Sequence, residues 1–175
     1  MTALIVLSPI LIVVSILVYF NLGSPVFFVQ ERVGKDNKVF KMIKFRSMKD
    51  SKDKNGNYLS DEERLTPFGA KLRSLSIDEL PELINILKGD MSIIGPRPER
   101  PEFTQEFNEE IPGFINRLAV KPGLTGWAQI NGGYDITPQE KLVEDIYYIE
   151  NRSILLDFKI ILKTVKVVLT GHGAR

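Results

Sequence analysis

An almost unbroken apolar segment near the amino terminus restricts the possible folds of this chain more than any other feature. Residues 3–20 have apolar side chains, and this run is interrupted only by Ser8, Pro9 and Ser15. A straight helix of this length rises about 27 Å, which barely crosses the hydrocarbon core of a bilayer. A signal peptide needs a basic region before the apolar run and a small-residue cleavage site after it, and the sequence has neither. The segment is therefore predicted to be a membrane helix.

Pro9 leaves two membrane topologies open. Its ring removes one backbone hydrogen bond and crowds the preceding turn, which disfavours a straight spanning helix. In a re-entrant helix the chain bends at Ser8-Pro9 and leaves on the side where it entered, and the Ser8 hydroxyl helps to satisfy the freed carbonyl groups. The pattern alone supports both topologies equally. Six basic residues within 32–46 predict that the following region lies on the cytoplasmic side.

The composition excludes several kinds of chemistry. The chain has 175 residues, 43% of them hydrophobic and 26% charged, which suffices for one folded domain. A net charge of +1 gives no reason to expect a nucleic-acid partner. The chain has no cysteine and one histidine, His172, so neither a thiolate site, a catalytic triad nor a multi-histidine metal centre is expected. Any catalysis must use carboxylates, lysine, arginine, hydroxyl groups or a hard cation.

Periodicity and turn residues predict a mostly α fold with a small β-hairpin, which is an α+β class. Residues 26–30 and 38–43 have strand character on either side of the turn residues 34–37. Helices are predicted to start at 66–67 and 137–138, where threonine precedes a proline suited to the first helical position.

The last predicted helix, residues 154–169, is apolar except for a few polar positions. Lys159, Lys163 and Lys166 follow each other at intervals of four and three residues and form one basic stripe. Such a helix either lies in the plane of a membrane interface or is buried with one wet edge. The membrane segment at the other end of the chain favours an interfacial amphipathic helix.

Two adjacent carboxylates, Asp78 and Glu79, form the first candidate site. They are predicted to lie in the first turn of a helix that ends at Lys88-Gly89, where free backbone N–H groups favour anions. The stretch also has an ordinary interpretation, because Ser76 and Glu79 have the spacing of a capping box.

The segment Pro96-Arg97-Pro98 is the second candidate. The two prolines restrict the backbone to an extended form and present Arg97 from a stiff support, as a bidentate phosphate contact requires. An ordinary proline-rich linker has the same pattern. Residues 121–133 are rich in glycine and contain the only tryptophan, and a loop of this kind lets backbone N–H groups approach a ligand.

Seven segments that occur in order along almost the whole chain resemble the bacterial sugar transferases, specifically the small monotopic phosphoglycosyl transferases. They are residues 8–9, 30–34, 40–48, 72–83, 85–92, 95–98 and 121–132. The resemblance implies transfer of a sugar 1-phosphate from a UDP-sugar to undecaprenyl phosphate with release of UMP. This reaction is the initiating step in making exopolysaccharides and other glycoconjugates.

The resemblance also implies roles for individual residues. Asp78 is the expected nucleophile, which forms a covalent phosphosugar intermediate that the lipid phosphate then attacks, and it is the expected ligand of Mg²⁺. Glu79 completes the dyad, either by activating the acceptor or by supporting Mg²⁺. Arg73, about one helical turn away, is expected to clamp a phosphate. Arg97, held between Pro96 and Pro98, is expected to contact the nucleotide.

The family's architecture favours the re-entrant topology. We therefore expect residues 1–22 to form a re-entrant membrane helix broken at Ser8-Pro9, and residues 23–175 to form a compact catalytic domain on the cytoplasmic face of the bacterial inner membrane. Membrane lipid and a second copy of the chain are the other expected partners. Some relatives have an arginine where this chain has Gly133-Tyr134, so the identity of the sugar stays open.

Two other functions need fewer of these features. A glycosidase-like pair needs carboxyl groups that face each other across about 5 Å or more, whereas adjacent residues of a helix point about 100° apart. A non-catalytic membrane scaffold would need only the amphipathic ends, and it would tolerate single replacements of Asp78, Arg73 and Arg97.

Overall fold

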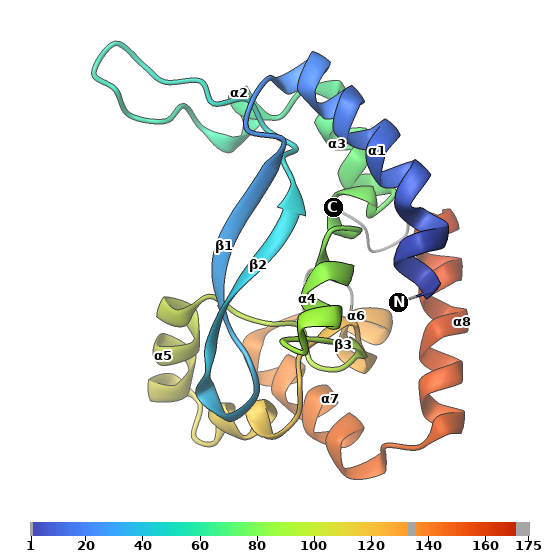
Figure 1. The fold of residues 1–175 in the computed structure, drawn as a ribbon. Helices are drawn as coiled ribbons and strands as arrows, with labels where there is room; N and C mark the ends of the chain where they lie inside the picture. The colour runs from blue at the N-terminus through green and yellow to red at the C-terminus, as the bar shows by residue number, and fades with distance from the viewer. Residues whose placement is uncertain (1, 133–135, 171–175) are drawn as a thin grey trace.

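A computed structural model describes residues 2–132 and 136–170; His172 and Gly133-Tyr134 lie outside this part. A long β-hairpin runs through the molecule and helices pack along it (Figure 1). The α-helices are α1 (Thr2–Leu22), α2 (Asp61–Arg64), α3 (Pro67–Ser74), α4 (Glu82–Lys88), α5 (Pro101–Glu110), α6 (Trp127–Gly132), α7 (Pro138–Asn151) and α8 (Ile154–Thr170). The strands are β1 (Phe27–Val33), β2 (Val39–Phe45), β3 (Ser92–Ile94) and β4 (Gly123–Thr125). Three short 3₁₀ turns cover Lys35–Asn37, Ile77–Glu79 and Phe114–Ala119. The predicted mostly α fold with a small hairpin is confirmed.

The hairpin formed as the turn residues predicted. Strands β1 and β2 pair antiparallel from Phe27 opposite Phe45 to Val33 opposite Val39. In the connecting turn Asp36 and Asn37 have positive φ values of 55° and 60°. These two residue types tolerate the left-handed region better than most, so the turn closes without a glycine at either position.

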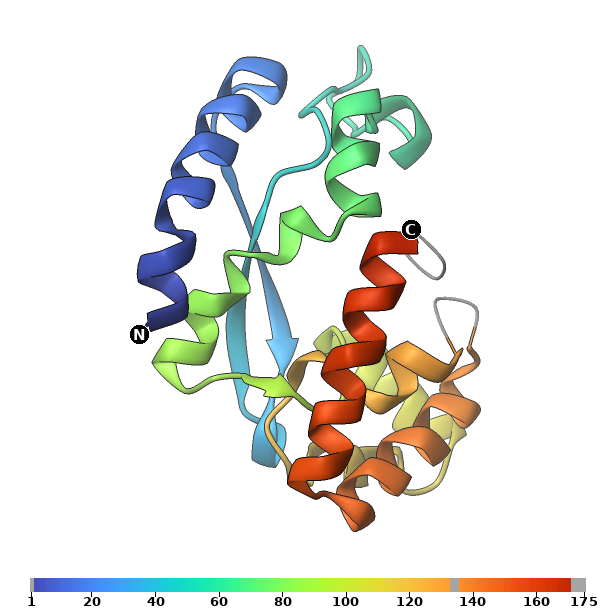
Figure 2. The same ribbon diagram turned by 90° about the vertical axis from the view of Figure 1, so that its right-hand side faces the viewer.

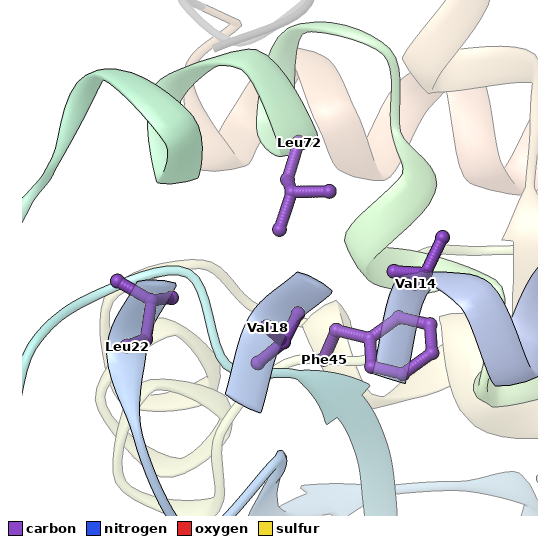
Figure 3. Packing of buried hydrophobic residues seen from close by; sticks show 5 residues of the cluster. All are labelled: Val14, Val18, Leu22, Phe45 and Leu72. Carbon is purple, nitrogen blue, oxygen red and sulfur yellow. The ribbon is translucent and has the colours of Figure 1, made fainter. Parts of the chain in front are cut away.

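Helix α1 packs one face against the rest of the protein. Its Val14, Val18 and Leu22 form a buried cluster with Phe45 of β2 and Leu72 of α3 (Figure 3). The opposite face exposes large apolar side chains, among them Ile12, Ile16 and Phe20. The burial of apolar surface therefore fixes α1 to the hairpin and to α3.

Helix α1 is assigned as one α-helix with Pro9 inside it, so its helical assignment is not interrupted at Ser8-Pro9. The helix ends at Leu22, where the membrane segment was predicted to end. Within the part of the chain that the structure describes, no helix has both the length and the apolar character to cross a membrane. The re-entrant path stays a prediction.

Helix α8 turns its basic stripe partly toward the protein. The Nζ atoms of Lys159 and Lys163 lie 5.1 Å and 5.4 Å from the centroid of the Trp127 ring, a cation–π arrangement. Ile160 is fully buried against Ile94 and Tyr148. The outward side of α8 exposes apolar side chains instead, at positions 154, 155, 158, 162 and 165. The two lysines therefore stabilise the docking of α8, while its place in a membrane interface stays a prediction.

A parallel pair of short strands, β3 and β4, was not predicted. The two backbone segments lie so close together that a Cβ atom on Gly123 would be 2.1 Å from the backbone nitrogen of Gly95. A Cβ atom on Gly126 would lie 2.2 Å from the carbonyl oxygen of Gly95. The glycines of the 121–133 segment thus allow two backbones to touch, and this contact places residues 96–98 beside β4.

Candidate active site

The adjacent carboxylates Asp78 and Glu79 lie on the 3₁₀ turn between α3 and α4. The predicted capping box is wrong, because Ser76 has a left-handed backbone (φ 52°) and its side chain caps nothing. Helix α4 starts only at Glu82, after Pro81, and ends as predicted at Gly89, whose φ is 85°. A sharp turn at Ser76 therefore separates the carboxylates from both helices.

Glu79 is held by two cations. Its Oε1 atom accepts hydrogen bonds from Lys44 Nζ at 2.7 Å and from Arg97 Nη2 at 2.6 Å. Burial opposes the charge of this carboxylate, but Arg97 and Lys44 together hold its pKa well below its usual range. Glu79 is thus an ionised anchor that joins β2 to the segment after β3.

Asp78 has a different environment. The residue is 9% exposed, and its carboxylate accepts no hydrogen bond from the residues that the structure describes. Burial, followed by the neighbouring charge of Glu79, raises the pKa of Asp78 to about 6, and Lys44, Arg73 and Arg97 limit this rise. The group is therefore mostly ionised at neutral pH and unengaged, which suits a nucleophile.

Arg73 and Arg97, both predicted as phosphate contacts, approach the dyad from different elements. Arg73 of α3 donates from Nε to Ser47 Oγ at 2.9 Å, and Arg97 reaches Glu79 from the segment after β3. The side chain of Arg97 is 28% exposed. Both guanidinium groups are close enough to Asp78 to favour its charged form, and positive charge of this kind suits a site for a diphosphate.

Lys44 and Glu82 belong to the same cluster and were not predicted as site residues. Lys44 Nζ lies 3.2 Å from Glu82 Oε1, and Glu82 is 2% exposed. Burial raises the pKa of Glu82 above its usual range although Lys44 opposes this rise. A signal for Lys44 exists in the sequence, because it follows the buried Met42 at the strand period of two and so shares its face of β2.

The protein side chains alone supply only part of a coordination shell for the Mg²⁺ expected at Asp78. Among the described residues, no cluster of three or more acidic, histidine or cysteine side chains could hold a metal. Mg²⁺ usually takes one or two carboxylates and completes its shell with water and substrate phosphates. The unengaged carboxylate of Asp78 fits that pattern, whereas Glu79 is occupied by two cations.

Comparison with known proteins decides the family. The profile of the family described as "Bacterial sugar transferase" matches residues 1–171. The chain belongs to the bacterial sugar transferase family. It is therefore a transferase, and the resemblance seen in its motifs is confirmed.

Curated relatives of this sugar transferase share its sequence over most of its length. It is 43% identical over 173 residues to the UDP-N-acetylgalactosamine-undecaprenyl-phosphate N-acetylgalactosaminephosphotransferase of Aeromonas hydrophila. The matched region covers 96% of this chain and 41% of that protein. It is 41% identical over 169 residues to the UDP-glucose:undecaprenyl-phosphate glucose-1-phosphate transferase of Escherichia coli (strain K12), covering 93% of this chain and 36% of that protein. It is 46% identical over 166 residues to the uncharacterized sugar transferase EpsL of Bacillus subtilis (strain 168), covering 95% of this chain and 81% of that protein.

Proposed function

We propose that this sugar transferase moves a sugar 1-phosphate from a UDP-sugar to undecaprenyl phosphate, releases UMP, and passes through a covalent intermediate on Asp78. Two of its relatives are named for transfer from a UDP-sugar to undecaprenyl phosphate. In a cell this reaction would begin the assembly of an exopolysaccharide or another glycoconjugate.

The contrast between the two adjacent carboxylates is the observation that supports this proposal most strongly. Glu79 is bound by Lys44 and Arg97, whereas the carboxylate of Asp78 is unengaged within the described part of the chain. A covalent nucleophile needs an ionised oxygen that is free to approach phosphorus. Asp78 meets this need and Glu79 does not.

In the first step an Asp78 carboxylate oxygen attacks the phosphorus nearest the sugar. A bond forms between Asp78 and this phosphorus, the bond from phosphorus to the bridging oxygen breaks, and UMP leaves with that oxygen and its electron pair. Arg73 and Arg97 stabilise the negative charge on the transferring and departing phosphates. Mg²⁺, when bound with help from Asp78, supplies further charge neutralisation on the diphosphate.

In the second step an oxygen of undecaprenyl phosphate attacks the phosphorus of the intermediate. The acyl phosphate bond breaks, the Asp78 carboxylate is restored, and the product is a polyprenyl diphosphosugar. The low pKa of Glu79 makes it a weak proton acceptor. We therefore assign Glu79 to holding Lys44 and Arg97 in place, not to activating the acceptor as a base.

The lipid substrate requires the site to lie at a membrane surface. Helices α1 and α8 lie on the same side of the molecule (Figures 1 and 2), and both expose large apolar side chains. This arrangement supports a position at a membrane surface. The proposal takes that surface to be the cytoplasmic face of the bacterial inner membrane, and it keeps a re-entrant path for residues 1–22.

The intact mass of the protein tests the covalent route. Detergent-solubilised protein is incubated with Mg²⁺ and a panel of UDP-sugars, without lipid. We expect a mass gain of one phosphosugar with the correct donor, discharged by undecaprenyl phosphate. Asp78→Asn should form no adduct, because an amide is a poor nucleophile. Asp61→Asn, which changes an exposed carboxylate on α2, is the matched control and should form the adduct normally.

Three outcomes would contradict the proposal. Adduct formation in Asp78→Asn at the wild-type rate would remove Asp78 from the role of nucleophile. Release of UMP only after lipid is added, without any adduct, would indicate direct transfer between the substrates. The absence of both adduct and UMP with every donor would favour the scaffold function.

A further inference from the structure

The backbone that supports Arg97 is held at four consecutive carbonyl groups. Each accepts a hydrogen bond from a different residue, and the four donors lie on β1, on the 3₁₀ turn Phe114–Ala119 and on β4. The pairs are Pro96 O with Gly123 N at 3.0 Å, Arg97 O with Arg117 Nη2 at 2.8 Å, Pro98 O with Arg32 Nη1 at 3.0 Å, and Glu99 O with Val33 N at 2.9 Å. Two of the four donors are arginine side chains. The stiffness predicted from the two prolines is thus reinforced by contacts from distant residues.

Arg117 is the most deeply buried of these donors. It lies on the 3₁₀ turn Phe114–Ala119 and is 1% exposed. Its Nε donates to Asp145 Oδ2 at 2.8 Å, and its Nη2 lies 2.7 Å from the same oxygen. Asp145 belongs to α7 and is also 1% exposed. The planar guanidinium therefore binds a carboxylate and the carbonyl of Arg97 at the same time.

A continuous series of contacts links α7 to the carboxylate dyad. Asp145 orients Arg117, Arg117 holds the carbonyl of Arg97, and the guanidinium of Arg97 reaches Glu79 beside Asp78. A second contact from α7, Lys141 to Glu99 at 2.7 Å, anchors the end of the same segment. Helix α7 is thus the rigid element against which the position of Arg97 is set.

Fold stability alone does not account for this arrangement. Removing two charges from water costs several kcal/mol for each ion, and well-packed apolar side chains often replace a buried ion pair without loss of stability. An apolar pair, however, could not donate a hydrogen bond to the Arg97 carbonyl. The group that requires a buried arginine here is therefore the backbone of Arg97.

We propose that Arg117, oriented by Asp145, is a positioning residue that fixes Arg97 for binding the phosphates of the donor. This inference rests on the proposed function, in which Arg97 contacts the nucleotide. A displacement of about 1 Å at a substrate contact can cost about 10²-fold in rate, so one hydrogen bond behind the site has a measurable effect.

Arg117→Lys tests the positioning role. Lysine keeps a positive charge opposite Asp145, but its single ammonium lacks the fork that reaches both partners. We expect kcat/KM for the UDP-sugar to fall by up to about 10²-fold, mainly through a higher KM. Arg100→Lys is the matched control, because Arg100 pairs with Glu102 on the surface and should leave kcat/KM unchanged.

A double-mutant cycle separates positioning from a general structural effect. In an Arg97→Ala background, Arg117→Lys should change KM little further, since the group that it positions is already gone. If Arg117→Lys does not fold, the neutral pair Arg117→Met with Asp145→Leu replaces it in the same cycle.

The outcomes distinguish this inference from the proposed function. An unchanged KM in Arg117→Lys, or equal losses with and without Arg97, would overturn the positioning role while transfer by the wild type stands. A wild-type protein that releases no UMP from any donor with lipid present would overturn the proposed function, and the positioning of a donor contact would fall with it.

Discussion

The role of Glu79 can be tested by removing only its charge. Its carboxylate accepts hydrogen bonds from Lys44 and Arg97, and it lies beside the ionisable Asp78. Glu79→Gln keeps the length of the side chain and most of its packing. The substitution therefore isolates what the negative charge does for its two cationic partners and for Asp78.

Two effects of opposite sign follow from the geometry. A hydrogen bond to a charged group contributes about 1.5–3 kcal/mol, so loosening Arg97 should lower kcat/KM for the UDP-sugar by roughly 10- to 100-fold. The charge of Glu79 is also the second-largest cause of the raised pKa of Asp78, which is about 6. Removing it should lower that pKa.

The pH dependence of adduct formation measures both effects. Asp78 attacks only when it is ionised, so in the wild type the rate should fall as the pH drops through about 6. In Glu79→Gln the acidic limb should move to lower pH while the plateau rate is reduced. An acidic limb that stays in place or moves to higher pH would refute this account. Complete loss of adduct at every pH would indicate that Glu79 takes part in the chemistry directly.

Two further predictions concern stability. Asp78→Asn should raise the free energy of unfolding by at most about 3 kcal/mol above pH 6, because folding raises the pKa of Asp78 from 3.8 to about 6 and the wild type loses stability as the pH rises through this window. Urea denaturation of both proteins should show no difference below about pH 4. Gly69→Ala should destabilise the protein by about 1–3 kcal/mol, since its Cβ would lie 1.8 Å from the Ser47 carbonyl oxygen. Helix propensity alone predicts that this substitution stabilises the protein by about 1 kcal/mol. The sign of the measured change in unfolding free energy therefore shows whether the close backbone contact or helix propensity dominates.

Local chemistry made several elements predictable. Thr137 caps α7 with a capping box to Glu140, and Thr66 caps α3. The turn at residues 34–37 closes the hairpin, and Gly89 ends α4 in the left-handed region. Each of these signals lies within four residues of the element that it governs, so no tertiary contact is needed to recognise it.

Non-local contacts explain what the sequence could not predict. The strand β3 pairs with β4, about 30 residues later, and only the two crossing backbones explain their glycines. In α7 the apolar Val143 is 60% exposed while the charged Asp145 is buried, the reverse of what their polarity alone predicts. A buried aspartate becomes intelligible only with its partner Arg117, which lies 28 positions away in the sequence.

In the candidate site, too, the sequence predicted which residues matter but not their different environments. Local patterns marked Asp78, Glu79 and Arg97 as candidates, the family resemblance added Arg73 and gave all four their expected roles, and the structure brings Glu79 and Arg97 into contact. The sequence did not reveal that the two carboxylates differ. Burial acts on both, but Glu79 alone is bound by cations.

Neighbouring residues on a tight helical turn point in different directions, which is how one turn creates two environments. Glu79 points to Lys44 and Arg97 and stays ionised at any physiological pH. Asp78 takes no part in those hydrogen bonds, and burial and the charge of Glu79 raise its pKa toward neutrality. Environments that push two pKa values apart often mark different roles in a reaction. Here the ionised anchor holds the cations, and these cations keep the adjacent nucleophile charged without binding it, so that it remains free to attack phosphorus.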